Sequence, residues 1–285
     1  MEKMPVKHIH EILKEPKLSG SFSIRDVQEM LSGKAMVQEL HRHDFFYILV
    51  VAHGGGQHDI DFHLHPVTDQ SVFIMRPGQV HQITLDANST GYLMQFKDEF
   101  YLPKDKTSKQ LLHNASRCNL YQFPPAKFQK LMLTLDNIFQ EDTSLQDEHY
   151  EAIRANMDLF FIELIRHSSK CAAMLGTSED QELLEKFLDL MESNVGGGKG
   201  VSAYAAMLNL SNYQLNTMVK TRLGKTTSEL INERTILEAK RLLLATSEQI
   251  YQIAHHLGYE DVSYFIRFFR KHTSYSPEAF RQNFK

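Results

Sequence analysis

Short apolar segments with a period of two fill the first part of the chain. Residues 60–64, 71–75 and 92–96 are examples, and turn-forming stretches such as RPG at 76–78 separate them. Alternation of this kind places successive side chains on opposite faces of a strand. A series of short strands with turn signals between them predicts an antiparallel β barrel or jelly roll, from about residue 21 to 101.

The pattern changes to a helical period after the FPP stretch at 123–125. Residues 128–139 and 150–167 each place apolar side chains at i, i+3, i+4 and i+7, as one face of an amphipathic helix requires. These apolar faces exceed what one edge of a barrel is expected to cover, and such stripes commonly bury themselves against a partner. We therefore expect this helical pair to form a homodimer.

A polar stretch, GTSEDQ at 176–181, predicts a linker followed by a helix start, because Ser178 and Gln181 have the spacing of a capping box. Everything beyond it has a helical pattern. The sequence thus predicts an α+β multidomain fold. Its parts are a β barrel or jelly roll at 1–123, a helical dimerisation segment at 124–175, a linker at 176–181 and an all-α domain at 182–285.

Composition and charge narrow the class of protein. The chain has 285 residues, of which 42% are hydrophobic, and no apolar run reaches the roughly 18 residues of a membrane helix. Two cysteines are too few for a disulfide framework, so we expect a cytoplasmic protein without a membrane partner. The net charge of −4 is unevenly spread, because residues 195–285 hold 12 Lys and Arg against 7 Asp and Glu. This basic end could bind nucleic acid if it also carried a suitable motif.

Such a motif is present as a weak internal repeat, at 205–220 and 254–270. Each copy has the pattern of a helix, a tight turn and a second helix, at about 201–221 and 250–272. The turn holds Asn209 in one copy and Gly258 in the other, and both residue types tolerate a positive φ. The other matched pairs are Ala205 with Ala254, Leu208 with Leu257, Leu215 with Phe265, and Val219 with Phe269. The sequence therefore predicts two helix-turn-helix units in tandem.

The segment QIAHHLGYEDVSYFIRFFRKHTSYSPEAFR at 252–281 resembles the signature of the AraC family of bacterial transcription regulators. The similarity covers about residues 178–285 and includes the long connecting helix at 228–246. It departs from the family pattern at Ser274, where glycine is usual, and at Thr235, where arginine is usual. The resemblance implies binding to the major groove of double-stranded DNA, and as a further partner RNA polymerase.

The DNA-binding residues are expected on the faces of the two second helices that point away from their apolar seam. The resemblance places Tyr213, Asn216 and Thr217 at base-reading positions, and Lys220 is better placed for a phosphate. Arg267 is the best candidate for a bidentate contact to guanine. The remaining candidates in the second unit are Val262, Ser263, Ile266 and Arg270. Val262 and Ile266 have an equally good explanation as core residues.

The segment from HRHDFF at 41–46 to RPGQVH at 76–81 resembles the cupin-like sensor domain of many AraC-type regulators. His41, His43 and His81 stand at the positions of cupin metal ligands, but the glutamate of a four-ligand site is missing. A two- or three-histidine site could still hold a metal ion with open positions. We favour a place for these histidines at the rim of an effector pocket, with neither metal nor cofactor. That pocket is assigned to His41, His43, Phe45, Tyr47 and His81, whereas His58, His63 and His65 are expected on an outward-facing strand.

Two functions from different classes follow from these features. The favoured function is a sequence-specific DNA-binding transcriptional regulator, an activator, whose barrel binds a small-molecule effector such as a sugar. In that case the protein is not an enzyme and has no catalytic residues. The alternative is a metal-dependent cupin-type enzyme with an accessory helical domain, and the missing glutamate and the tandem DNA-binding units argue against it.

Overall fold

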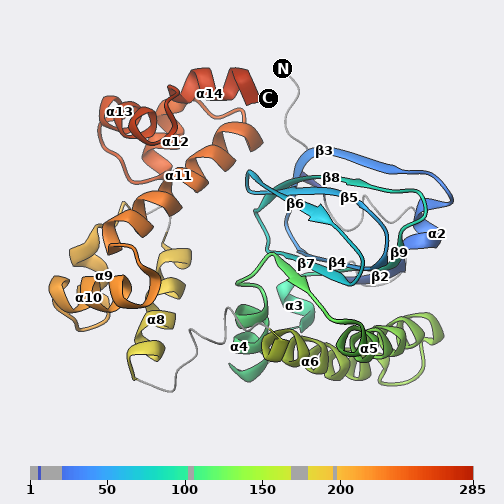
Figure 1. Cartoon of the computed structure of the whole chain (residues 1–285). Helices are drawn as coiled ribbons and strands as arrows, with labels where there is room; N and C mark the ends of the chain where they lie inside the picture. The colour runs from blue at the N-terminus through green and yellow to red at the C-terminus, as the bar shows by residue number, and fades with distance from the viewer. Residues whose placement is uncertain (1–5, 8–20, 102–105, 168–178, 195–197, 285) are drawn as a thin grey trace. The chain divides into compact units, whose positions relative to one another are not determined.

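The computed structural model describes residues 6–7, 21–101, 106–167, 179–194 and 198–284. The described residues form two compact units, one of residues 6–167 and one of residues 179–284 (Figure 1). They are called the N-terminal unit and the C-terminal unit below, and each is described by itself. None of the helices within the described residues combines the length and apolar character of a membrane span.

Two five-stranded sheets face each other in the N-terminal unit (Figure 1). The first has the order β1 (Val6–Lys7), β3 (Met36–His43), β8 (Val80–Leu85), β5 (Gly56–Ile60) and β6 (His63–Val67). The second has the order β10 (Leu120–Gln122), β7 (Ser71–Met75), β4 (Phe46–His53), β9 (Thr90–Phe96) and β2 (Phe22–Asp26). Side chains from both sheets, such as Leu49, Phe73 and Ile83, fill the space between them.

Helices cover the outer face of the second sheet. They are the long helices α5 (Pro125–Ser144) and α6 (His149–His167) and the short helices α3 (Asp98–Tyr101) and α4 (Lys106–Ala115), whereas α2 (Val27–Leu31) packs into the core between the sheets. In β4, Tyr47 and Leu49 face the first sheet, whereas Ile48 and Val50 pack against the helices. The strand is therefore buried on both faces, which explains its unbroken apolar run.

The sheet covers the apolar stripes that were expected to bind a second copy of the chain. Leu131, Leu135 and Ile138 of α5 and Phe160 of α6 are fully buried in the core shared with the second sheet. The premise that one barrel cannot cover these faces is therefore wrong. Leu133 and Leu159 stay 63% and 56% exposed on the same two helices.

The C-terminal unit is entirely helical in its described residues. Its helices are α8 (Glu179–Ser193), α9 (Val201–Met207), α10 (Asn212–Leu223), α11 (Thr227–Ala245), α12 (Ile250–His256), α13 (Val262–Thr273) and α14 (Pro277–Phe284). Together with the two-sheet unit, this architecture confirms the predicted α+β fold class with tandem helix-turn-helix units.

The predicted repeat is confirmed in its backbone and in its core. Asn209 and Gly258, at the two turns, have φ values of 55° and 81°. The matched apolar residues of the second helices are fully buried, and they are Leu215, Val219, Phe265 and Phe269. The later turns also correspond, because α10 ends at Gly224 with φ 71° and α13 ends at Ser274 with φ 66°. Ser274 therefore adopts the left-handed conformation that glycine adopts with less strain.

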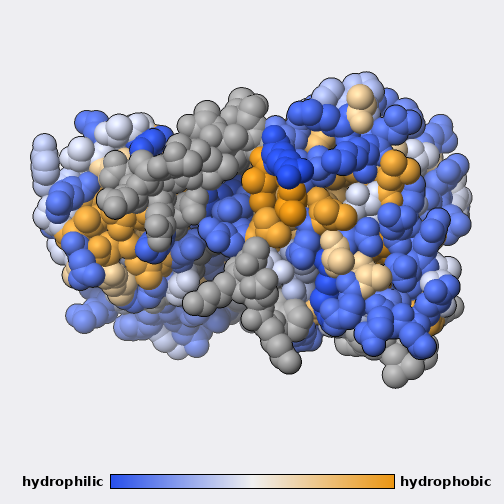
Figure 2. All heavy atoms as spheres, turned by 90° about the horizontal axis from the view of Figure 1, so that it is seen from below, coloured by the Kyte–Doolittle hydropathy of each residue, from blue (hydrophilic) through white to orange (hydrophobic). Residues whose placement is uncertain are grey.

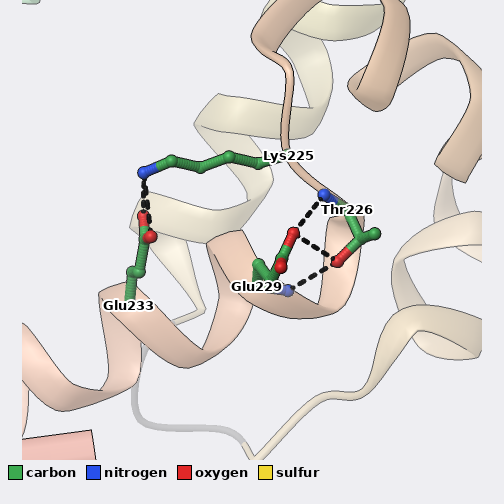
Figure 3. Close-up of polar contacts among 4 residues, drawn as sticks. All are labelled: Lys225, Thr226, Glu229 and Glu233. Atoms are coloured by element: carbon green, nitrogen blue, oxygen red, sulfur yellow. Dashed lines mark hydrogen bonds and ion pairs between the residues drawn. The ribbon is translucent and has the colours of Figure 1, made fainter.

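A capping box fixes the start of the connecting helix α11. The Thr226 hydroxyl accepts a hydrogen bond from the Glu229 amide at 3.2 Å, and the Glu229 carboxylate accepts one from the Thr226 amide at 2.7 Å (Figure 3). Lys225 and Glu233 form an ion pair of 2.8 Å alongside. Because two of the unpaired amides at the helix end gain acceptors, the direction in which α11 leaves the first helix-turn-helix unit is well defined.

Candidate DNA-binding surface and histidine cluster

The outward face of α10 carries most of the residues expected to contact DNA in the first unit. Tyr213 is 80% exposed, and Thr217 and Lys220 are also exposed. A capping box of Ser211 and Gln214 fixes the start of the helix, so the first turn, which contains Tyr213, is regular. A regular, exposed first turn is the part of a recognition helix that meets base edges.

Asn216 has a structural role that the sequence did not indicate. Its side-chain oxygen accepts a hydrogen bond of 3.1 Å from the backbone amide of Thr227, the first residue of α11. The side chain is only half-exposed. This contact uses the acceptor that a bidentate contact to adenine would need. Asn216 therefore links α10 to the connecting helix.

The outward face of α13 is basic. Arg267 and Arg270 are exposed, with Ser263 on the same side, while Phe265 and Phe269 are fully buried. Ile266 is 36% exposed, whereas Val262 is half-buried. The sequence left open whether these two residues face DNA or the core, and the structure exposes Ile266 more than Val262. The face also carries exposed Tyr264 and Lys271, which sequence reasoning did not single out. Such a mixture of cationic and planar groups suits contacts to phosphates and base edges.

Four histidines meet inside the N-terminal unit. Strand pairing places His41 of β3 opposite His81 of β8. The Nε2 atom of His81 lies 2.8 Å from Nε2 of His43 and 3.0 Å from Nε2 of His41. Its Nδ1 atom lies 2.8 Å from Nε2 of His58. Below, this group of His41, His43, His58 and His81 is called the histidine cluster.

The histidine cluster lies in the interior of the N-terminal unit. Its members are at most 3% exposed. The ring of Phe45 lies 4.4 Å from that of His43, and Tyr47 stacks on His43 at 5.3 Å. The expected position at the rim of a pocket is therefore wrong, because β3 and β8 direct these side chains into the space between the sheets. The five assigned residues, His41, His43, Phe45, Tyr47 and His81, are nonetheless brought together.

Burial also sets the electrostatics of the cluster. It lowers the pKa of His58 to about 3, with smaller contributions from the charges of His65 and His41. It raises the pKa of Tyr47, whose hydroxyl is buried and has no hydrogen-bond partner among the described residues. At neutral pH His58 and Tyr47 are therefore uncharged.

His58 is the member that sequence reasoning missed. It was grouped with His63 and His65 on an outward-facing strand, and this is wrong for His58, which is fully buried. His63 is exposed and His65 is half-exposed. A signal was available in the alternation of β5, because Ile60, two residues after His58, is also buried. Residues i and i+2 of a strand share a face.

Two family models match this chain. One is described as a helix-turn-helix domain and matches residues 204–283. The other is described as an AraC-like ligand binding domain and matches residues 32–101. The chain resembles the AraC family in both of its units. Members of that family are DNA-binding transcriptional regulators and not enzymes, and in this chain the segment that matches the helix-turn-helix model follows the segment that matches the ligand-binding model.

Individual proteins are also similar to this chain. The chain is 24% identical to the "HTH-type transcriptional activator RhaS" of Pectobacterium carotovorum, over 85% of this chain and 86% of the relative. It is 24% identical to the RhaS activator of an Enterobacter species, over 85% and 87%. A solved structure of an AraC-type transcriptional regulator from Chromobacterium violaceum is 28% identical, covers 36% of this chain and 92% of its own, and has a TM-score of 0.33.

Proposed function

We propose that this AraC-family protein is a transcription activator that reads two adjacent DNA sites with one chain and responds to a small organic effector, for example a sugar. The observation that carries this proposal is the pair of exposed second helices, α10 and α13, each with a fully buried apolar face behind it. Activation is favoured because the similar proteins of Pectobacterium carotovorum and of an Enterobacter species are named as activators. An activator of this kind acts through contact with RNA polymerase.

The connecting helix sets the distance between the two DNA-reading helices. α11 has 19 residues, which at about 1.5 Å each make a strut of about 28 Å. One turn of DNA is about 34 Å long, and the recognition helices sit beyond the ends of the strut. We therefore expect half-sites about 10 base pairs apart, on the same face of the duplex.

Binding-site selection with the full chain tests this proposal. Arg267→Ala is expected to lower affinity for the selected site by about 1–3 kcal/mol and to relax preference at one base pair of one half-site. Thr217→Ala is expected to act on the other half-site. Lys220→Ala is the matched control, because losing a phosphate contact weakens binding to all sequences alike and lowers the salt slope by about 0.9.

The outcomes separate a specific regulator from a non-specific DNA-binding protein. A wild-type selection that returns no motif would remove the two-reader proposal. The same motif from wild type and Arg267→Ala would remove Arg267 from the base-reading residues. An unchanged salt slope in Lys220→Ala would place that side chain outside the interface.

We also propose that the chain acts as a homodimer through α5 and α6. Most of the apolar face of these helices is covered by the sheet, so the support for a dimer consists of Leu133 and Leu159, which are both more than half exposed. Figure 2, seen from below relative to Figure 1, shows apolar side chains grouped within a largely polar face. Exposed apolar groups of this kind favour association with a partner.

Light scattering of the full chain at micromolar concentration tests the dimer. We expect a mass of two chains, because Leu133 and Leu159 lose solvent contact on association. A variant with Leu133→Glu and Leu159→Glu is expected to be monomeric at the same concentration, with unchanged thermal unfolding of the monomer. A wild-type monomer, with and without DNA, would contradict the proposal.

A further inference from the structure

No placement of hydrogen atoms on neutral rings gives every close nitrogen–nitrogen contact of the histidine cluster one donor and one acceptor. Nδ1 of His41 lies 2.6 Å from the carbonyl oxygen of Glu39, which only accepts, so Nδ1 carries the hydrogen. In a neutral ring Nε2 of His41 then has a lone pair, and it faces Nε2 of His81 at 3.0 Å. His81 would have to donate from Nε2 to complete this bond.

A neutral His81 cannot make both of its Nε2 contacts. If its Nε2 atom donates to His41, the same atom has no lone pair left for His43, which lies 2.8 Å away. If Nε2 keeps its lone pair, the contact with His41 brings two lone pairs together. A hydrogen serves one of the two contacts well, and a second proton would create an imidazolium at a position with 0% exposure, where a charge is costly.

A metal ion at the centre resolves the conflict between the two Nε2 contacts of His81. Nε2 atoms of His41, His43 and His81 then direct their lone pairs at the ion. Nδ1 of His81 carries the hydrogen and donates it to Nε2 of His58, 2.8 Å away. Nδ1 of His41 donates to the Glu39 carbonyl. Each of these two ligands thus has the outer hydrogen bond that orients metal-binding imidazoles and fixes their tautomer.

The spacing of the three rings also fits a metal ion. One ligand nitrogen from each of His41, His43 and His81 can be chosen so that all lie within 4.8 Å of one another. Zinc–nitrogen bonds of about 2.0–2.1 Å in a tetrahedral site require nitrogen atoms roughly 3.3 Å apart. The distances from Nε2 of His81 to Nε2 of His43 and of His41, 2.8 and 3.0 Å, need to widen by only a few tenths of an ångström. Small side-chain rotations are enough for this change.

The donors indicate which ions bind and what completes the site. Three imidazoles suit zinc, cobalt, nickel, copper or ferrous iron, whereas magnesium and calcium prefer oxygen donors. Three protein ligands leave at least one coordination position open. The ring of Tyr47 lies 5.3 Å from that of His43 and 5.2 Å from that of His81, and its hydroxyl is buried without a partner. This hydroxyl is a hydrogen-bonding group for water or for an effector oxygen at the open position.

We infer that His41, His43 and His81 bind one divalent transition-metal ion, with His58 supporting His81 and with an open position for an oxygen ligand. This differs from the expectation drawn from the sequence, which assigned the residues to a pocket without metal. The regulatory consequence rests on the proposed function, because the ion and its oxygen ligand would then form the effector site of a DNA-binding regulator.

Cobalt titration of the full chain tests the inference. The purified protein is freed of metal with a chelator and titrated with Co²⁺, with calorimetry for stoichiometry and visible absorption for the ligand field. We expect one equivalent per chain. His43→Gln removes a ligand and is expected to weaken binding at least 100-fold, and His58→Gln is expected to weaken it about 10–100-fold through loss of ligand orientation. His63→Ala, an exposed histidine on neighbouring β6, is the matched control and should bind as wild type.

Each outcome decides the inference. Absence of saturable Co²⁺ binding by folded wild type overturns it, even if a variant fails to fold. Equal affinities of wild type, His43→Gln and His63→Ala also overturn it, since the ion would then bind elsewhere. DNA binding by the same samples is measured in parallel. Specific DNA binding without metal binding rejects only the metal site, whereas metal binding without specific DNA binding rejects the proposed regulator.

Discussion

Phe265→Ala is expected to lower the free energy of unfolding of the C-terminal unit by about 3–5 kcal/mol, as truncation of a buried phenylalanine generally does. Phe265 is fully buried, and its ring lies 5.4 Å from Tyr259 and 5.9 Å from Phe269. Ile266→Ala, one residue further along the same helix, is the matched control. Its side chain is 36% exposed, so we expect a loss of about 1 kcal/mol or less.

Hydrogen exchange in peptides of α12, α13 and α14 measures this difference in the full chain, because it reports local stability without requiring separate unfolding transitions. DNA affinity gives the second readout. Ile266→Ala is expected to weaken binding to the selected site while exchange stays slow, if its exposed side chain contacts a thymine methyl as the family resemblance implies. Fast exchange in Ile266→Ala with slow exchange in Phe265→Ala would reverse the two faces of α13.

The tandem repeat was predictable because its information is local. Asn209 and Gly258 mark the turns by their tolerance of a positive φ, and the apolar residues that follow at helical spacing can only form the seam. The faces of α10 and α13 follow from the same period. The structural role of Asn216 does not follow from this period, because its hydrogen-bond partner is the amide of Thr227, in another helix. Periodicity identifies a face but not the neighbour that the face meets.

The interior of the N-terminal unit shows the same limit over longer distances. His58 contacts His81, 23 residues later, because β5 pairs with β8. Alternation in the sequence puts His58 on the same face of β5 as Ile60, but it does not identify the strand that pairs with β5. The expectation that the barrel leaves the apolar faces of α5 and α6 uncovered was wrong for a related reason. The unbroken run in β4 indicates a strand buried on both faces, and the helices supply the second cover.

Gly91→Ala is expected to cost the N-terminal unit more than about 4 kcal/mol, in the range reached only by severe defects in a core. Gly91 lies in β9 with φ 136°, which L-residues rarely adopt. A Cβ atom there would lie 2.0 Å from the carbonyl oxygen of Val50 and 3.0 Å from its carbonyl carbon. Relief requires the backbones of β4 and β9 to move apart, since no flexible side chain can give way.

The effect should spread because β4 lies at the centre of the second sheet, between β7 and β9. Val50 packs against the helices and Val51 against the first sheet, so a shift of this strand disturbs both cores. Gly78→Ala is the matched control, because Gly78 also has a positive φ, 83°, but a Cβ atom there meets nothing within 4 Å. Only backbone strain of about 1–2 kcal/mol is then expected. Thermal unfolding and hydrogen exchange in β4 and β9 distinguish the variants, and near-native exchange in Gly91→Ala would mean that the pairing of Val51 with Gly91 is incorrect.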